Sequence, residues 1–128
     1  MSEQYQVLIV DDSPTETARF ERILQSNGFS TTAVTSGEQG VVIAARIKPH
    51  VILMDVVMGG MNGFQATRKI TTQEATKHIP VIMVTTKDQT TDRVWAQRQG
   101  AKGYLTKPVN EQELLQTIAT LMEQVKIQ

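Results

Sequence analysis

Short apolar runs alternate along the chain with stretches in which apolar residues recur every three or four positions. Continuous apolar runs of about four to eight residues are typical of buried strands, and the wider spacing is typical of helices with one buried face. The apolar runs predict five strands, at Gln6–Val10, Ser30–Val34, Val51–Asp55, Pro80–Thr85 and Gly103–Leu105.

The stretches between these strands predict helices with recognisable ends. Ser13 is a suitable N-cap, Pro14 suits the first helical turn, and Glu16 completes a capping box with Ser13. Gly28 then ends this helix. We expect four further helices, from Ser36 to about Ile47, from Phe64 to about Thr71, from Asp88 to Gln99 and after the cap Asn110.

The alternation of fully apolar strands with helices predicts a parallel sheet that is covered by helices on both faces. Right-handed crossovers leave few topologies, and the flavodoxin-like order 2-1-3-4-5 is common among sheets of this kind. We therefore expect an α/β, doubly wound, five-stranded fold with five helices. We expect it to form a single domain over residues 1–128, without an output domain.

The composition excludes several classes of site and partner. The chain has no cysteine, so it has no disulfide and no thiolate site. Its 13 basic and 13 acidic residues cancel, and we expect no sequence-specific binding of nucleic acid. Neither a secretory signal nor an apolar run near the roughly 20 residues that cross a bilayer is present. We expect a cytoplasmic monomer with no membrane contact.

Polar side chains gather where the predicted strands end. Asp11 and Asp12 follow the first strand, Asp55 ends the third, Thr85 ends the fourth, and Lys107 follows the fifth. Because the carboxyl ends of parallel strands share one edge, we expect these groups to meet at the topological switch point. Carboxylates that crowd together repel unless a cation joins them, and oxygen ligands without His or Cys favour Mg²⁺.

A carboxylate at such a site can attack phosphorus and form an aspartyl phosphate. This chemistry gives a reason for Asp55, because an isolated carboxylate in an apolar segment is costly to bury. Lys107 and Thr85 can pair with the other phosphoryl oxygens. We expect Asp55 to lie at the strand end as a phosphate acceptor, outside the core.

Four stretches, in their order and spacing, resemble the CheY-like receiver domains of two-component response regulators: LIVDDS, VILMDVVMGGMNGF, PVIMVTTKD and YLTKPV. The resemblance implies a phosphorelay in which a histidine kinase or a phosphotransfer domain passes a phosphoryl group to Asp55. It also implies a phosphoacceptor switch, rather than an enzyme with a separate substrate, that catalyses its own phosphoryl transfer and dephosphorylation.

The same resemblance implies a role for each residue of the site. Thr85 is the hydroxyl switch, Tyr104 the switch aromatic and Lys107 the phosphoryl-binding lysine. A cis peptide bond is implied before Pro108. The Mg²⁺ ligands are implied to be Asp11, Asp12, Asp55 and the backbone carbonyl of Val57.

Longer stretches, among them DDSPTE and VWAQRQGAKGYLTKPV, are similar to PilH-type regulators of type IV pilus twitching motility. This likeness implies a chemotaxis-like kinase and a downstream protein target in the pilus machinery or in a chemotaxis-like pathway. In the family, the fourth helix, fifth strand and fifth helix form the usual output face. We expect Trp95, on the fourth helix, to lie at the edge of the core.

Several positions near the acceptor carry separate expectations. Gly59 replaces the usual proline of the family, which predicts a more mobile loop. Thr86 replaces a small residue, which predicts narrower access to Asp55 and slower phosphorylation or hydrolysis. We expect Met58 and Met61 to be exposed beside the acceptor. His50 and His78 are interpreted as solvated histidines.

Three other functions share parts of this pattern. A flavin mononucleotide binder has the same fold, but the acidic stretch DDSPTE would repel its phosphate. A phosphatase with an aspartate nucleophile typically has an acid/base aspartate two residues later, where this chain has Val57. A receiver that has lost phosphorylation would act only as a scaffold, although every group that phosphorylation needs is present.

Overall fold

Strands and helices alternate throughout this structure, a computed structural model that describes residues 4–86 and 90–127. The predicted alternation is confirmed because each apolar run forms a strand and each amphipathic stretch a helix. In chain order the elements are β1 (Gln6–Val10), α1 (Pro14–Ser26), β2 (Ser30–Val34), α2 (Gly37–Ile47), β3 (Val51–Asp55), α3 (Gly63–Thr72), β4 (Val81–Thr85), α4 (Thr90–Arg98), β5 (Gly103–Thr106) and α5 (Glu111–Ile127).

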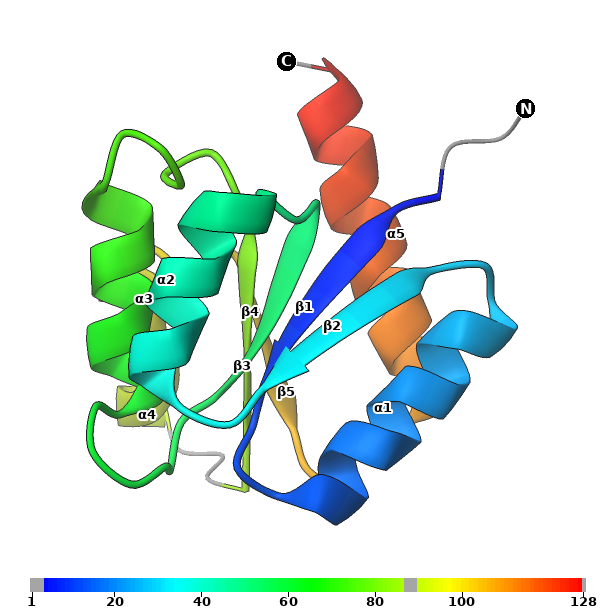
Figure 1. Cartoon of the computed structure of the whole chain (residues 1–128), viewed down its shortest axis with the longest axis horizontal. Helices are drawn as coiled ribbons and strands as arrows, with labels where there is room; N and C mark the ends of the chain where they lie inside the picture. Colours follow the sequence, from blue (N-terminus) through cyan, green and yellow to red (C-terminus); the bar gives the residue numbers. More distant parts are fainter. Residues whose placement is uncertain (1–3, 87–89, 128) are drawn as a thin grey trace.

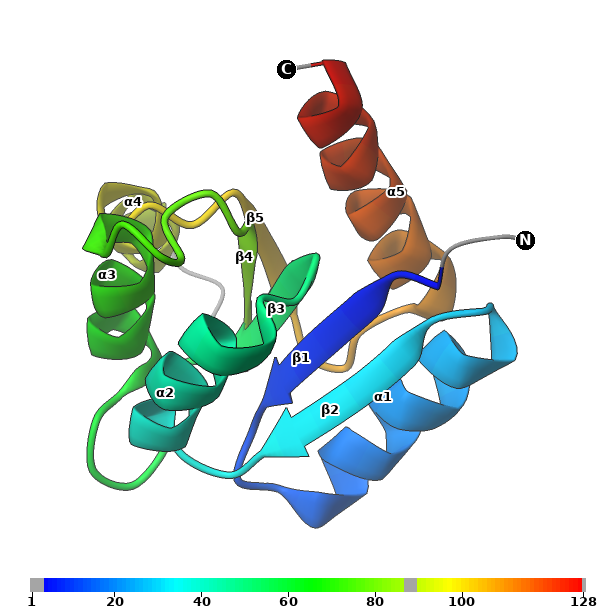
Figure 2. The ribbon, with the colours of Figure 1, turned by 45° about the horizontal axis from the view of Figure 1, so that its top comes forward.

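The strands form one parallel sheet in the order β2-β1-β3-β4-β5, which confirms the flavodoxin-like topology (Figure 1). β1 lies between β2 and β3, and Val10 at its end is level with Val34 and Met54. α1 and α5 cover one face of the sheet, while α2, α3 and α4 cover the other (Figures 1 and 2). The switch point therefore lies at the carboxyl ends of β1 and β3.

Side chains alternate along each strand between the cores on the two faces. On β1, Val7 and Ile9 pack with α1 and α5, whereas Leu8 and Val10 pack with the helices of the other face. None of these four side chains is more than 1% exposed. Each buried side chain of this kind contributes about 1.5–3 kcal/mol. The strand is apolar throughout because both of its faces are covered.

The predicted capping box at α1 is incomplete, whereas α3 has one that was not predicted from the sequence. At α1, Ser13 Oγ accepts a hydrogen bond from the Glu16 N–H at 3.4 Å, but Glu16 Oε2 is buried without a hydrogen-bond partner. The capping box there is only half formed. A complete one occurs at α3, where Asn62 Oδ1 accepts from the Gln65 N–H at 2.9 Å and Gln65 Oε1 accepts from the Asn62 N–H at 3.0 Å.

The predicted ends of the other elements agree closely with the structure. β5 runs one residue further, to Thr106, and β4 begins at Val81. Pro80 lies just outside β4, where its carbonyl accepts a hydrogen bond from the Ile52 N–H at 3.0 Å. The predicted start of the fourth helix, Asp88, lies outside the described residues.

Two predictions about exposure are wrong. Met58 is buried, at 9% exposure, because it packs into the core beneath α2 and α3, while Met61 is half-buried. Trp95 is 52% exposed, so it does not lie at the core edge. α4 instead turns Ala96 toward the core, at 1% exposure, and the ring of Trp95 has the Arg98 guanidinium 5.9 Å from its centre.

The two histidines are exposed, as the sequence predicted. His50 is nevertheless ordered by its neighbours, since its Nδ1 accepts a hydrogen bond from the Gln6 N–H at 2.9 Å and its ring meets the edge of Tyr5. This contact joins the start of β1 to the turn before β3. It gives His50 a structural position rather than a ligand position.

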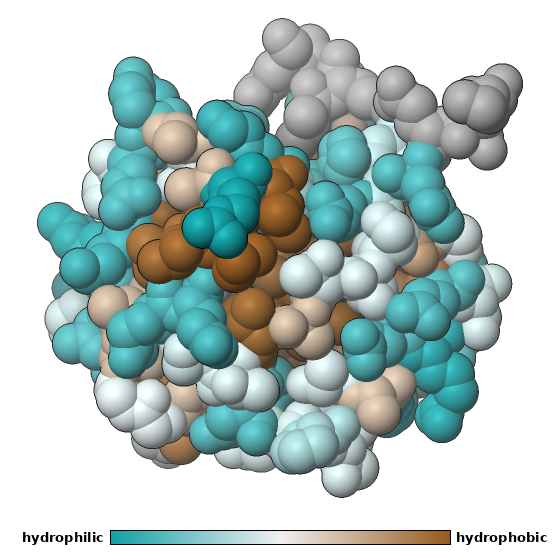
Figure 3. All heavy atoms as spheres, viewed as in Figure 1, coloured by the Kyte–Doolittle hydropathy of each residue, from teal (hydrophilic) through white to brown (hydrophobic). Residues whose placement is uncertain are grey.

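The face of the molecule seen in Figure 3 mixes polar and apolar side chains, with a small apolar area beside α2. Val42 on α2 is 56% exposed. In the described part of the chain, none of the helices combines the length and the apolar character that crossing a membrane requires.

Candidate functional site

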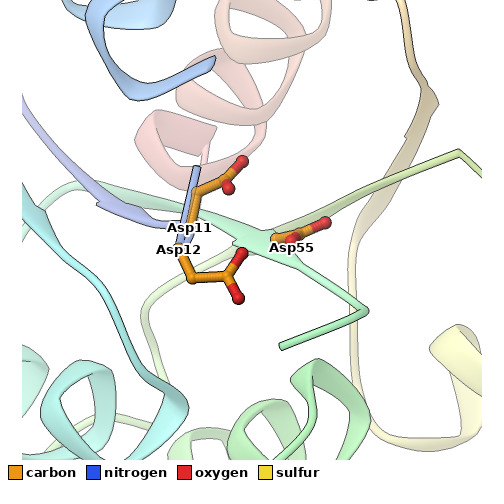
Figure 4. Close-up of side chains that lie close together, drawn as sticks. All are labelled: Asp11, Asp12 and Asp55. Atoms are coloured by element: carbon orange, nitrogen blue, oxygen red, sulfur yellow. The ribbon is translucent and has the colours of Figure 1, made fainter. Parts of the chain in front are cut away.

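Three carboxylates meet at the switch point of the sheet. β1 and β3 are neighbours and end level with one another, so Asp11 and Asp12 leave the sheet beside Asp55. Figure 4 shows the side chains of Asp11 and Asp12 extending from the end of β1 to the side where Asp55 lies. One oxygen from each carboxylate lies within 4.8 Å of the others. The predicted gathering of these three residues is therefore present.

Asp11 is the most firmly held of the three carboxylates. It is 2% exposed, and its Oδ1 accepts a hydrogen bond from the Ser13 N–H at 2.9 Å. Its Oδ2 accepts from Lys107 Nζ at 3.0 Å, and its backbone N–H donates to the Val34 carbonyl at 3.1 Å. Asp12, by contrast, is exposed. The site thus has a fixed buried wall and an opening to solvent.

Lys107 reaches this site from the loop after β5. Its side chain is 11% exposed, and Nζ lies 3.0 Å from Asp11 Oδ2 and 3.4 Å from Asp55 Oδ1. Its backbone N–H donates to the Thr85 carbonyl at 2.7 Å, and the peptide bond to Pro108 is cis, as the resemblance implied. Burial lowers the pKa of Lys107, but the hydrogen bond to Asp11 and the charge of Asp55 outweigh it and raise the pKa.

Asp55 lies deeper than expected. It is only 7% exposed, but it ends β3 and belongs to neither hydrophobic cluster, so it is a buried carboxylate at the edge of the sheet rather than a core residue. Burial, followed by the charge of Asp11, raises the pKa of Asp55 from 3.8 to about 6, against the opposing effect of Lys107. The ammonium of Lys107 therefore does not offset the cost of burying Asp55 beside Asp11, and the site favours binding of a further cation.

This raised pKa predicts how stability depends on pH when no metal is bound. Between pH 4 and 6 the folded Asp55 carboxyl keeps a proton that the unfolded chain has already released. The free energy of unfolding therefore falls as the pH rises through this window, by about 2 kcal/mol. Urea unfolding in EDTA at pH 4.5 and 7.5 measures this. Asp55→Asn should remove most of the loss, and an equal loss in that variant would assign it to other groups.

The loop between Asp55 and α3 is closed tightly at its far end. The Gly63 N–H donates to the Val56 carbonyl at 2.9 Å, and a Cβ at Gly63 would collide with the Asp55 carbonyl oxygen. Glu38 Oε1, on α2, accepts from the Met61 N–H at 3.1 Å. The sequence did not predict either contact, since Glu38 lies in a different element, the first turn of α2, and carries no local signal.

Within this loop, Val57 and Gly59 face outward. Val57 is 58% exposed and follows Asp55 by two positions, so its carbonyl lies on the loop that borders the carboxylates. A Cβ at Gly59 would meet no atom within 4 Å. Gly60 adopts a φ of +74°, which explains a glycine at that turn.

Thr85 and Tyr104 lie on the two strands beyond β3. Thr85 ends β4, is 1% exposed and is level with Thr106 on β5. Tyr104 is half-buried, is level with Met83, and has the Arg93 guanidinium 4.6 Å from its ring centre. The structure thus brings Thr85 to the edge that holds Asp55 and Lys107. Tyr104 lies two residues before Thr106 on β5, and so further from this edge than Thr85 does.

A family model described as the response regulator receiver domain matches residues 7–119. The chain belongs to this family. Over 116 residues this receiver domain is 53% identical to Protein PilH of Pseudomonas aeruginosa, an alignment that covers 91% of this chain and 96% of PilH. Family membership argues against the flavin-binding and phosphatase alternatives.

Solved structures of the same family agree with this receiver domain in fold. The chemotaxis protein CheY4 of Vibrio cholerae superposes with a TM-score of 0.88 and 29% identity, over 93% of this chain and 99% of that one. The receiver domain of the sensor histidine kinase PA1611 of Pseudomonas aeruginosa superposes with a TM-score of 0.87 and 31% identity, over 94% and 99%. That structure has a magnesium ion coordinated in its active-site cleft.

Proposed function

We propose that this receiver domain is a response regulator switch that accepts a phosphoryl group on Asp55. The donor is a phosphohistidine of a histidine kinase or a phosphotransfer domain. One observation carries the proposal: Asp55 lies within 4.8 Å of two further carboxylates and 3.4 Å from Lys107 Nζ, at the switch point of the sheet. Carboxylates do not crowd in this way for stability alone, because they repel.

In the proposed transfer, a carboxylate oxygen of Asp55 forms a bond to phosphorus as the phosphorus–nitrogen bond of the phosphohistidine breaks. The electron pair of the broken bond stays on the leaving imidazole. Lys107 Nζ, 3.4 Å from Asp55 Oδ1, is positioned to pair with a phosphoryl oxygen and offset its charge. Thr85, at the end of the adjacent strand, offers its hydroxyl to a second phosphoryl oxygen. The domain therefore supplies its own catalytic groups, for transfer and for hydrolysis.

The residues of the site fit Mg²⁺. They offer only oxygen atoms, they lie close enough to share one ion, and Asp12 keeps an opening to water. Asp11, Asp12, Asp55 and the carbonyl of Val57 would hold the ion, which would neutralise phosphoryl oxygens during transfer. Asp11 is already fixed by Ser13 and Lys107, so this ligand needs little rearrangement.

The proposed switch links Asp55 to the face formed by α4, β5 and α5. In the phosphorylated state a phosphoryl oxygen gives Thr85 a charged partner, a hydrogen bond of about 1.5–3 kcal/mol. Its movement toward Asp55 would leave space beside β4 that the ring of Tyr104 can fill. Such an energy shifts a population ratio by roughly ten- to a hundredfold, so we infer that a minor active state exists before phosphorylation.

We extend the proposal to the pathway on the strength of one relative. The 53% identity to PilH extends over nearly the full length of both chains. It supports a role in type IV pilus twitching motility, with a chemotaxis-like kinase upstream. The downstream target is then a protein, in the pilus machinery or in a chemotaxis-like pathway. The exposed Trp95 and Val94 of α4 would belong to the surface that it meets.

The proposal is tested by titrating the protein with Mg²⁺ and then with beryllofluoride, which mimics the phosphoryl group. Backbone NMR shifts should change around Asp11, Asp55 and Lys107 and extend to residues 94–104. Asp12→Ala should weaken the Mg²⁺ response, and Asp55→Asn should remove the beryllofluoride response. Changes confined to the loops of the site would show that the domain does not signal through α4 and β5.

A further inference from the structure

A second pocket lies at the opposite end of the sheet from Asp55. It has a volume of about 740 Å³, within the range of about 300–1,000 Å³ that is usual for small-molecule sites. Its walls are the end of α3 with the segment before β4, the end of α4 with the turn before β5, and α5. Figure 2 brings this end forward, with the segments that enter β4 and β5 beside α3 and α4.

The walls of this pocket are fixed by hydrogen bonds. Thr71 Oγ1 on α3 donates to the Gln99 carbonyl at the end of α4, at 2.6 Å. Gly100 packs against the same threonine at a φ of +96°, where a Cβ would lie 2.7 Å from Thr71 Oγ1. The Lys102 N–H donates to the Val81 carbonyl at 2.8 Å. A ligand would therefore meet a pocket that is already formed.

The lining of the pocket combines an apolar floor with a cationic rim. Ile79 and Leu121, at 2% and 6% exposure, contribute to the floor together with the buried Pro80. The charged side chains that line the pocket are all basic, whereas the chain as a whole is neutral. They are Arg68, Lys77, Arg98 and Lys102, with His78 beside them.

Most of this positive charge lacks a counter-ion. Lys77 Nζ lies 2.6 Å from Glu74, but no salt bridge joins Arg68, Arg98 or Lys102 to an acidic side chain among those that the structure describes. These three residues are exposed, and they come from three separate segments of the chain. Cations in the last turn of a helix also stabilise the helix dipole, as Arg98 does on α4, but Lys102 lies outside any helix.

We propose that this pocket binds a small organic polyanion with an apolar body, of the nucleoside polyphosphate class. Guanidinium groups pair with phosphate oxygens through two parallel hydrogen bonds, which suits Arg68 and Arg98 to a di- or triphosphate. The floor of Ile79, Pro80 and Leu121 takes the flat base, which an inorganic anion lacks. The side chains of Gln99 and Gln124, which also line the pocket, offer amide groups to the sugar and base.

This site is separate from the acidic one. β4 spans five residues between the two ends of the sheet, or about 16 Å. Binding in the pocket should therefore persist in Asp55→Asn, so failure of this inference is distinguishable from failure of the proposed phosphorylation.

Isothermal titration with ATP in EDTA tests the inference, because without Mg²⁺ the acidic site has no attraction for a polyanion. We expect one ATP per chain, at least tenfold weaker binding in Arg98→Ala and in Lys102→Ala, and no change in Arg46→Ala. Arg46 is a matched control, since it lies in the last turn of α2 as Arg98 lies in the last turn of α4. Circular dichroism establishes that each variant is folded.

Two further probes define the ligand class. Tripolyphosphate should bind more weakly than ATP, because it cannot use the apolar floor, and adenosine should not bind measurably. Equal affinity for tripolyphosphate and ATP, or equal weakening in Arg46→Ala and Arg98→Ala, would overturn the assignment. An acidic peptide that bound more tightly than ATP would do the same and indicate a protein partner.

Discussion

Asp55→Asn is expected to abolish labelling of the domain by a small phosphodonor such as acetyl phosphate. The amide is isosteric with the carboxylate but is not a nucleophile toward phosphorus, so no aspartyl phosphate forms. The rest of the acidic site should keep its structure, because Lys107 keeps its hydrogen bond to Asp11 at 3.0 Å. Mass spectrometry after donor treatment should show the phosphorylated species in the natural protein and none in the variant.

The control for this experiment is Glu74→Gln, which removes a carboxylate from an exposed position and should label normally. Labelling of Asp55→Asn to the level of the natural protein, as a hydroxylamine-sensitive acyl phosphate, would move the acceptor to another carboxylate. A natural protein that resists labelling with Mg²⁺ present would favour the scaffold alternative, in which phosphorylation has been lost.

Gly63→Ala is expected to lower the free energy of unfolding by about 3 kcal/mol or more. The new Cβ would collide with the Asp55 carbonyl oxygen and lie 2.8 Å from Val56 Cα. Both are backbone atoms, which cannot rotate away as a flexible side chain can. The loop would have to open, breaking the 2.9 Å hydrogen bond from the Gly63 N–H to the Val56 carbonyl.

Urea unfolding measures this loss directly, and Gly59→Ala provides the comparison within the same loop. A Cβ at Gly59 meets no atom within 4 Å, so this variant should stay within about 0.5 kcal/mol of the natural protein. Because the loop also sets the position of Asp55, Gly63→Ala should slow phosphoryl labelling in the fraction that folds. Similar stability of the two variants would show that the loop relaxes freely at Gly63.

Local sequence patterns determined most of the fold. The apolar run Val51–Asp55 is a strand because both faces of a central strand are covered, and Ser36 begins a helix because its hydroxyl accepts the Gln39 N–H. Alternation of such elements leaves few right-handed topologies, and one of them is observed. The meeting of Asp11, Asp12 and Asp55 then follows from strand order. The roles proposed for Thr85 and Tyr104 came from the family resemblance.

Tertiary structure decided whatever depends on how one element lies against another. Met58 is buried because its loop folds onto the core, and Trp95 is exposed because α4 turns Ala96 to the sheet instead. Neither the course of a loop nor the buried face of one short helix is defined by local periodicity. Glu38 reaches the acceptor loop, and Thr71 holds the end of α4, across gaps of 23 and 28 residues. Gly63 is required only because the loop folds back onto Asp55.

The two ends of the sheet differ in the same way, since the site at one end follows from the sequence and the site at the other depends on packing. At the carboxyl end, Asp55 and Thr85 end strands, and Asp11, Asp12 and Lys107 follow strands, so topology alone predicts that they meet. At the amino end, Arg68 comes from the middle of α3, Arg98 from the last turn of α4 and Lys102 from the turn before β5, and none of them is unusual in its own segment. Their separate segments become one basic pocket only after the helices pack. Sequence periodicity is local, whereas the charge that a pocket presents is the sum over segments that only packing brings together.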